Sequence, residues 1–183
     1  MYDAYGYYQA GSVATASTVS QDYGLLTVSQ AYSRFNSLCW RAQAKRMWSK
    51  LTGRSRRLLD LDDARDNRDI EGIYEAGCLT IEVAKIKGSE CRVCDFDREF
   101  LPLSESSRQR WVNVYGARMA DIPLPAISVV QIGDVYYVRD GHHRVSVARL
   151  MGEAYIEANT QVWQLRGETA SAPAMTMRLV NAM

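Results

Sequence analysis

The sequence predicts an α/β (α+β) protein in which a small mixed-sheet domain follows an N-terminal helical extension. Residues 28–51 contain neither Gly nor Pro, as a long helix requires. The run 79–86 alternates apolar and polar residues with the period of a strand, and two later apolar runs flank Gly133-Asp134, a typical hairpin turn. We therefore divide the chain into four segments: a flexible Tyr/Ser/Ala-rich tail (1–27), a basic helical extension (28–76), the mixed-sheet domain (77–164) and a flexible C-terminal tail (165–183).

The composition is that of an ordinary folded protein. Hydrophobic residues make up 47% of the 183 residues and charged residues 23%, which excludes wholesale disorder. No apolar run is long enough to span a bilayer, and the N-terminus lacks the pattern of a secretory signal. The four cysteines are unevenly placed and do not suggest a disulfide framework. These features predict a cytoplasmic protein with reduced thiols and no membrane span.

The expected helix over 28–51 ends at Gly53, which suits the position after a helix C-terminus. It carries two apolar faces rather than one. The first face comprises Val28, Tyr32, Phe35, Cys39 and Ala42, and the second comprises Trp40, Ala44, Met47, Trp48 and Leu51. The helix therefore bends or buries two faces against different partners, and we expect its tryptophans to dock on the domain.

Charge is concentrated in this part of the chain, although the net charge of the whole is only +1. Residues 34–57 include eight basic and no acidic residues. Basic residues interleaved with aromatic residues are typical of a surface that binds nucleic acid, but they would also suit an acidic membrane or an acidic protein surface. A further alternative is a solvated helix face that binds no partner. The candidate contact residues look the most exposed: Lys50, Arg54, Arg56 and Arg57.

The rest of the chain alternates between helices and strands. A short helix is expected after Leu58, with Asp60 or Asp62 as its N-cap, followed by the strand 79–86. Ser104 or Ser106 starts a further helix that Pro123 ends. Its expected core positions are Trp111, Tyr115, Met119 and Ile122. The remaining elements are strands over 126–132 and 135–139, a helix over 143–151 closed by Gly152, and a strand over 154–163.

The segment from Asp140 to Arg144, with the sequence Asp-Gly-His-His-Arg, carries the strongest functional signal. A strand ends there, Gly141 permits a sharp turn and a helix begins at once, so backbone N–H groups and the positive end of the helix meet at one point. Two imidazoles and a guanidinium reach the same point, which together is typical of a phosphate site. The alternative is that the segment binds nothing: Asp140 is an N-cap, Gly141 is a turn residue, and the three basic residues that follow are a solvated helix start.

This motif, followed by Val-Ser-Val-Ala-Arg-Leu-Met-Gly, resembles the ParB/sulfiredoxin superfamily, and the resemblance covers about residues 78–163. It implies that the turn binds nucleotide phosphates, with ATP, ADP or CTP as the nucleotide and Mg²⁺ as the metal. The motif is most similar to that of the free serine kinase branch. By this resemblance the pocket is lined by Asp140, Gly141, His142, His143, Arg144 and Ser146, with Asp140 and His143 as catalytic candidates and Asp140 as the Mg²⁺ ligand.

Two departures narrow the function. Sulfiredoxins carry a Cys where this chain has His142, so we do not expect reduction of sulfinic acids. Partition proteins continue into a helix-turn-helix DNA reader beyond this domain, and we expect neither this reader nor a partition function here. We therefore expect a nucleotide-binding protein, with phosphoryl transfer or nucleotide hydrolysis as the reactions open to it. Such a reaction needs a carboxylate base, and no spacing singles one out among Glu82, Glu90, Asp95, Asp97 and Asp140. The alternative is a non-enzymatic module that binds DNA or an acidic protein surface through residues 34–57.

A second motif, Cys91-x-x-Cys94, offers two thiols that could join His142 and His143 as zinc ligands. One such pair without a second is a weak signal, and adjacent histidines seldom reach the same tetrahedral ion. A redox pair is a further alternative. We favour two incidental reduced thiols and do not expect zinc.

Overall fold

The computed structural model describes residues 25–53, 55–66 and 68–166. The helices are α2 (Leu25–Thr52), α3 (Leu61–Asp66), α4 (Arg108–Met119) and α5 (His142–Met151), with 3-10 turns η1 (Val83–Lys85) and η2 (Glu105–Ser107). The strands are β1 (Leu59–Asp60), β2 (Ile70–Glu82), β3 (Ile86–Ser89), β4 (Ile127–Ile132), β5 (Val135–Asp140) and β6 (Tyr155–Leu165). The α/β class with an N-terminal helix is confirmed, whereas the two predicted tails lie almost wholly outside the described residues.

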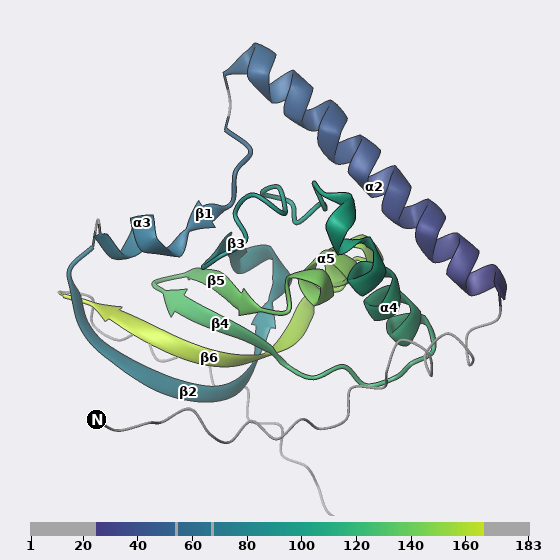
Figure 1. Cartoon of the computed structure of the whole chain (residues 1–183). Helices are drawn as coiled ribbons and strands as arrows, with labels where there is room; N and C mark the ends of the chain where they lie inside the picture. Colours follow the sequence, from purple (N-terminus) through teal and green to yellow (C-terminus); the bar gives the residue numbers. More distant parts are fainter. Residues whose placement is uncertain (1–24, 54, 67, 167–183) are drawn as a thin grey trace, which may run out of the picture.

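Within the described ranges, six strands form one mixed sheet in the order β1-β3-β5-β4-β6-β2. The hairpin β4–β5 and the long pair β2–β6 are antiparallel, whereas β3–β5 and β4–β6 are parallel. The long strands β2 and β6 curve together along one side of the sheet (Figure 1). Because β5 lies inside the sheet, the turn that follows its last residue, Asp140, starts from the centre of the fold.

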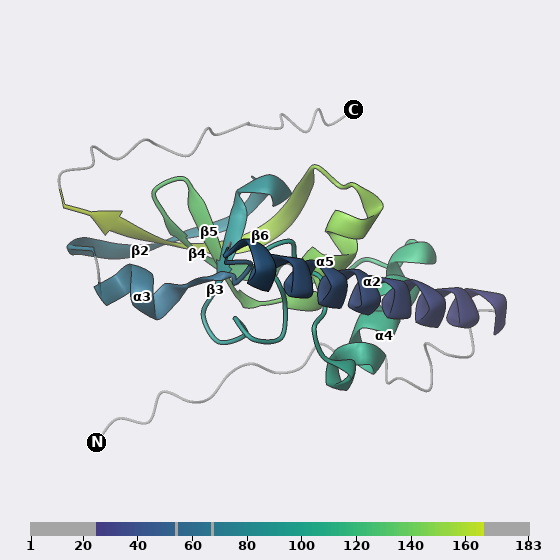
Figure 2. The ribbon, with the colours of Figure 1, turned by 90° about the horizontal axis from the view of Figure 1, so that it is seen from above.

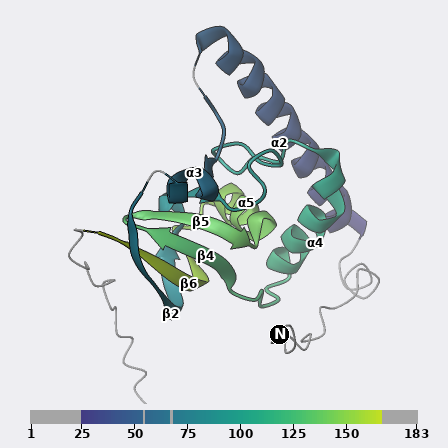
Figure 3. The ribbon, with the colours of Figure 1, turned by 60° about the vertical axis from the view of Figure 1, so that its left-hand side comes forward.

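The central hairpin is buried on both faces, because alternate side chains of a strand point to opposite sides. Ile127, Val129 and Val138 belong to one apolar cluster, which includes Phe96 and Phe100 of the long loop before α4. Residues of the other parity, such as Val130 and Tyr137, pack with Leu61 of α3 and with Trp163. Helices α3 and α4 lie at opposite ends of the sheet (Figure 3).

A separate core joins α2, α4 and α5, and α2 crosses over the other two (Figure 2). Phe35 of α2 is fully buried and meets the Trp111 ring edge-on, with ring centroids 5.7 Å apart. Trp111 in turn stacks on Tyr115 at 5.3 Å. The predicted first face of α2 is thus confirmed as the packed one, and the helix ends where expected, before Gly53 at φ +65°.

Other sequence predictions fare unequally. Asp60 is the N-cap residue of α3, since its Oδ1 accepts the Asp62 N–H at 3.0 Å. Residues 70–76 are strand rather than part of a helical extension, because they pair with β6. Met119 and Ile122 were expected in the core but are 50% and 40% exposed. The buried face of α4 runs through Trp111, Val112 and Tyr115 instead, and the helix has ended before residue 122.

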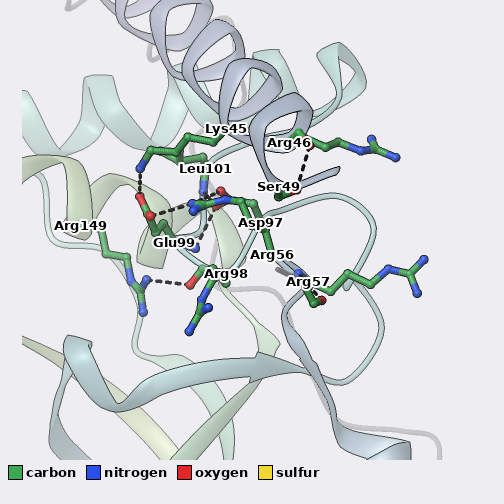
Figure 4. A network of polar contacts seen from close by, with 11 residues as sticks. Lys45, Arg46, Ser49, Arg56, Arg57, Asp97, Arg98, Glu99, Leu101 and Arg149 are labelled. Atoms are coloured by element: carbon green, nitrogen blue, oxygen red, sulfur yellow. Dashed lines mark hydrogen bonds and ion pairs between the residues drawn. The ribbon is translucent and has the colours of Figure 1, made fainter. Parts of the chain in front are cut away.

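An ion-pair network joins the C-terminal half of α2 to the loop before α4 (Figure 4). Glu99 accepts from Lys45 of α2 and, at 2.6 Å, from Arg56 of the segment that follows α2. Arg56 also reaches Asp97 at 3.0 Å. Burial by itself raises the pKa of Glu99, but the hydrogen bonds from Lys45 and Arg56 outweigh it and lower that pKa to about 2. The network therefore holds α2 against the domain through charge as well as apolar contact.

A glycine pair tests the packing of the sheet. A Cβ at Gly88 of β3 would lie 2.1 Å from Cδ1 of Tyr137, whereas a Cβ at Gly72 of β2 would meet nothing within 4 Å. We expect Gly88→Ala to lower the unfolding free energy by about 1–3 kcal/mol through overpacking. Gly72→Ala should change it by no more than about 0.5 kcal/mol. Urea unfolding of both variants checks this, and equal effects would contradict the packing described.

The low pKa of Glu99 predicts a pH dependence. A carboxyl group whose pKa falls from 4.5 to about 2 on folding stabilises the protein above pH 4.5, and this contribution disappears as the pH falls from about 4.5 towards 2. Glu99→Gln should therefore lower the unfolding free energy at pH 6 by about 0.5–1 kcal/mol, the range for partly exposed pairs.

Denaturant unfolding at several pH values checks this expectation. The difference between the wild type and Glu99→Gln should shrink as the pH falls through the window. Glu105→Gln is the matched control, because its ion pair with Arg108 involves a side chain that is 78% exposed. A difference for Glu99→Gln that stays constant down to pH 2 would contradict the pKa.

Candidate functional site

The turn between β5 and α5 has room for no residue but glycine at its centre. Gly141 adopts φ +98°, and a Cβ there would lie 2.5 Å from Cγ2 of Ile127. Gly141 also occupies the N-cap position of α5, so Asp140 is not the N-cap residue as the alternative reading held. A glycine has no side chain with which to cap the helix. The first N–H groups of α5 thus lack both an acceptor within the helix and a side-chain cap from Gly141.

His142 begins α5 and is buried, with 3% of its surface exposed. Its Nε2 lies 2.8 Å from the hydroxyl of Ser89, which also accepts the N–H of Arg92. Its ring stacks on Phe96 at 5.9 Å. Burial, assisted by the positive charge of Arg92, lowers the pKa of His142 to about 4. His142 is therefore a neutral part of the core at physiological pH.

His143 packs edge-on against Phe96 with ring centroids 5.4 Å apart. Burial lowers the pKa of His143 to about 4, and the charges of Arg92 and Arg110 act in the same direction. Its Nε2 is buried and has no hydrogen-bond partner among the described residues. The reading of the two histidines as a solvated basic helix start is therefore wrong, because aromatic packing and burial keep both rings neutral.

Arg144 holds the polypeptide segment that precedes β4. Its guanidinium donates to the carbonyl oxygens of Pro125 and Ala126, the latter at 2.9 Å, and to the Asp140 carboxylate at 2.6 Å. The Arg144 side chain is 13% exposed, whereas that of Asp140 is 79% exposed. Arg144 thus fixes the turn against the segment before β4, and the Asp140 side chain lies on the solvent-exposed side of the turn.

Ser146 lies one turn further along α5 and is 3% exposed. Its hydroxyl accepts the indole N–H of Trp111 at 3.0 Å. This hydrogen bond joins α5 to α4 inside the helical core. The structure thus brings Asp140, Gly141, His142, His143 and Arg144 together at the turn and leaves Ser146 on the core side of the helix.

Two arginines beside the turn were missed by the sequence analysis. The positive charges of Arg92 and Arg110 lower the pKa of His143, whereas the negative charges of Asp95 and Asp140 raise it. Arg92 pairs with Asp95 at 2.9 Å, and Arg110 is exposed in the first turn of α4. Both are far from the motif in sequence, and no spacing rule would connect them with it. The positive charges at the turn are therefore those of arginines rather than of the histidines, and Arg92 and Arg144 are each paired with an aspartate.

The second predicted site is the basic segment, whose four candidate contact residues were all expected to be exposed, and the structure agrees only in part. Lys50 and Arg57 are exposed, and Arg54 lies outside the described residues. Arg56 was expected to be exposed, but it is held by Asp97 and Glu99 with 23% of its side chain exposed. The expected docking of the α2 tryptophans on the domain is also wrong, because both side chains are exposed.

The tryptophans of α2 face away from the domain. Trp40 is 75% exposed and Trp48 is 69% exposed. The side of α2 that packs in the core with α4 and α5 carries Phe35 and Ala42 together with Ala31 and Leu38, and the tryptophans lie on the opposite side of the helix. The second apolar face therefore remains uncovered by the described part of the chain.

Metal ligands do not gather in the described part of the chain. No group of three or more His, Cys, Asp and Glu side chains there is close enough to hold an ion. Cys91 and Cys94 are exposed thiols. Asp140, the expected Mg²⁺ ligand, is paired with Arg144 and brings no second carboxylate with it. Among the same residues, no helix combines the length and apolar character needed to cross a bilayer.

Comparison with protein families, curated proteins and solved structures finds no match to this chain.

The neutral histidines predict a second pH dependence. Because their pKa falls from 6.5 to about 4 on folding, protons bind the unfolded chain first, and stability present above pH 6.5 is lost as the pH falls from 6.5 towards 4. The unfolding free energy should drop by up to about 1.4 kcal/mol per pH unit for each histidine.

Two measurements check this. Urea unfolding of the wild type and of His143→Phe should differ in slope between pH 6 and 5, because the variant lacks one of the two titrating rings but keeps an aromatic ring against Phe96. Imidazole resonances in NMR spectra should stay constant down to about pH 5. A titration midpoint near 6.5 for either ring would contradict the burial described.

Proposed function

We propose that this chain is a nucleotide-binding protein of the ParB/sulfiredoxin kind and that its 140–144 turn holds a nucleotide phosphate. The observation that supports this most directly is Nε2 of His143. That nitrogen is one of four buried side-chain atoms without a hydrogen-bond partner among the described residues, and of these four it alone belongs to the 140–144 turn. A buried polar atom without a partner is costly, and a phosphate oxygen would accept the N–H of a neutral imidazole there.

The surroundings of the turn favour an anion. The first N–H groups of α5 and the helix dipole attract negative charge, and Gly141 allows the ligand to approach the backbone closely. Arg92 and Arg110 act on the His143 ring with positive charge, and Asp95 and Asp140 act on it with negative charge. Arg92 is paired with Asp95, whereas Arg110 is exposed at the start of α4. In this proposal Arg144 keeps the wall of the site in place through Pro125 and Ala126, while the backbone amides and His143 contact the phosphate.

A phosphoryl-transfer or hydrolysis step is the catalytic form of this proposal. Asp140 is the carboxylate at the open edge of the turn, where it would orient an acceptor hydroxyl or a water molecule and take its proton. The residues present do not form a Mg²⁺ site by themselves, because Asp140 is a single carboxylate held by Arg144. We therefore assign no step to a metal.

Thermal-shift and NMR titrations with ATP, ADP, CTP and GTP, each with and without Mg²⁺, test phosphate binding. We expect at least one nucleotide to raise the melting temperature and to shift the amide signals of His142 and His143. His143→Phe removes the donor but keeps a ring against Phe96. It should weaken binding about 10-fold to 100-fold, the value of one hydrogen bond to a charged group.

Arg110→Gln and Arg118→Gln form a matched pair on α4. Both remove one positive charge, but Arg118 lies at the far end of the helix and pairs with Glu153. Only Arg110→Gln should weaken nucleotide binding. A normal melting transition that none of the four nucleotides shifts would overturn the proposal. Binding without turnover, or turnover unaffected by Asp140→Ala, would overturn the catalytic form alone.

The second candidate is a non-enzymatic module that acts through the basic segment on DNA or an acidic protein surface. It is supported by α2, which has no acidic residue, and by the exposure of Lys50 and Arg57. Arg56 is unavailable to such a partner while it pairs with Glu99. This candidate involves no nucleotide turnover, so the titrations above separate it from the first.

A further inference from the structure

Helix α2 presents an apolar stripe on the side that faces away from the domain. Its large side chains are Trp40, Met47, Trp48 and Leu51, which are 75%, 71%, 69% and 81% exposed, and Ala44 lies between them. At about 100° per residue, these positions share one face of the helix, opposite buried Phe35 and Ala42. Figure 1 shows α2 along the outer edge of the molecule, with no described element beyond it. Exposed apolar side chains that gather in this way usually mark an interaction surface.

Positive charge borders this stripe. Arg34 and Arg41 lie along one side of it and Lys50 along the other, and α2 contains no acidic residue. Lys45 does not contribute to this border, because it points into the ion-pair network in Figure 4. Basic side chains beside a row of tryptophan, methionine and leucine form a surface for an anionic partner that also offers apolar contact.

The geometry limits the kind of partner. Two copies of α2 that paired through this stripe would bring their arginine and lysine side chains together, and repulsion between these like charges opposes such a dimer. A groove that wraps around a helix is blocked, because Phe35, Leu38 and Ala42 on the opposite side are packed in the core. Nucleic acid would contact the basic side chains and the tryptophans of α2 but would leave Met47 and Leu51 in water. A flat anionic surface with an apolar interior satisfies all of these side chains.

We propose that the outward face of α2 docks on an anionic lipid bilayer, with the helix parallel to the membrane plane. Trp40, Met47, Trp48 and Leu51 enter the boundary between headgroups and acyl chains, and the flanking arginines and Lys50 contact lipid phosphates. The helix is already formed and is held by the Lys45–Glu99–Arg56 contacts, so binding does not require it to fold. The 140–144 turn belongs to another part of the molecule, and the two proposals stand independently.

Vesicles of equal parts phosphatidylglycerol and phosphatidylcholine test this, with pure phosphatidylcholine vesicles as the comparison. The chain has four tryptophans, and the other two, Trp111 and Trp163, are 0% and 8% exposed. A change in tryptophan emission therefore reports mainly on α2. We expect co-sedimentation with the anionic vesicles, a blue shift of the emission, and loss of both in high salt.

Matched variants separate the apolar and the charged contributions. Trp40→Ser with Trp48→Ser should weaken binding at least about tenfold, whereas Ile73→Ser with Tyr155→Ser, at exposed positions of the sheet, should not. Lys50→Gln should weaken binding about fivefold, the effect of one charge near an anionic surface. Lys87→Gln removes the same charge from an exposed position on β3 and should have little effect.

Because all of the substituted residues are exposed, unchanged thermal unfolding will show that the variants remain folded. The proposal is overturned if the folded protein does not sediment with anionic vesicles, or if it binds neutral vesicles equally well. It is also overturned if light scattering shows a dimer whose α2 tryptophans are already shielded. Salt-sensitive binding to DNA that protects these tryptophans, without vesicle binding, would assign the face to nucleic acid instead.

Discussion

The conformation of the loop between β3 and α4 depends on the hydrogen bonds of one buried carboxylate, that of Asp97. With 3% of its surface exposed, Asp97 accepts the N–H groups of Glu99 and Leu101, each at 2.9 Å, and the guanidinium of Arg56 at 3.0 Å. These bonds satisfy a charge that would otherwise be costly to bury. They fold the loop tightly enough that Phe100 adopts φ +57°. The loop then presents aromatic rings to α5 and a carboxylate, Glu99, to α2.

The chemistry of the 140–144 turn follows from this loop. Phe96 belongs to the loop, and its ring packs against the rings of both histidines. The histidines therefore serve as neutral, partly apolar groups, and the charge that would attract an anion is that of arginines from other elements: Arg110, which is exposed, and Arg92, which is paired with Asp95. A neutral imidazole can donate a hydrogen bond without the cost of burying a second charge. This division of roles is what the proposed phosphate site depends on.

The same loop sets the orientation of α2. Glu99 holds Lys45 and Arg56, and the helical core holds Phe35, so rotation of α2 about its axis would break contacts of both kinds. The face that carries Trp40 and Trp48 is consequently turned outward and kept there. A rigid, preformed apolar surface loses little conformational entropy when it binds a partner, which favours docking.

The sequence by itself determined the elements that local signals specify: the end of α2 before Gly53, the hairpin around Gly133 and the glycine turn before α5. Each depends on backbone conformation or hydrophobic period within a few residues. At the start of α3 the sequence left Asp60 and Asp62 as alternatives, and the structure selected Asp60. Only the tertiary structure decided which apolar face of α2 is buried, that Arg56 is paired, that both histidines are neutral, and that the charges of Arg92 and Arg110 act on His143. Burial and charge pairing arise between residues far apart in the chain, and the spacing of residues along the chain does not encode them.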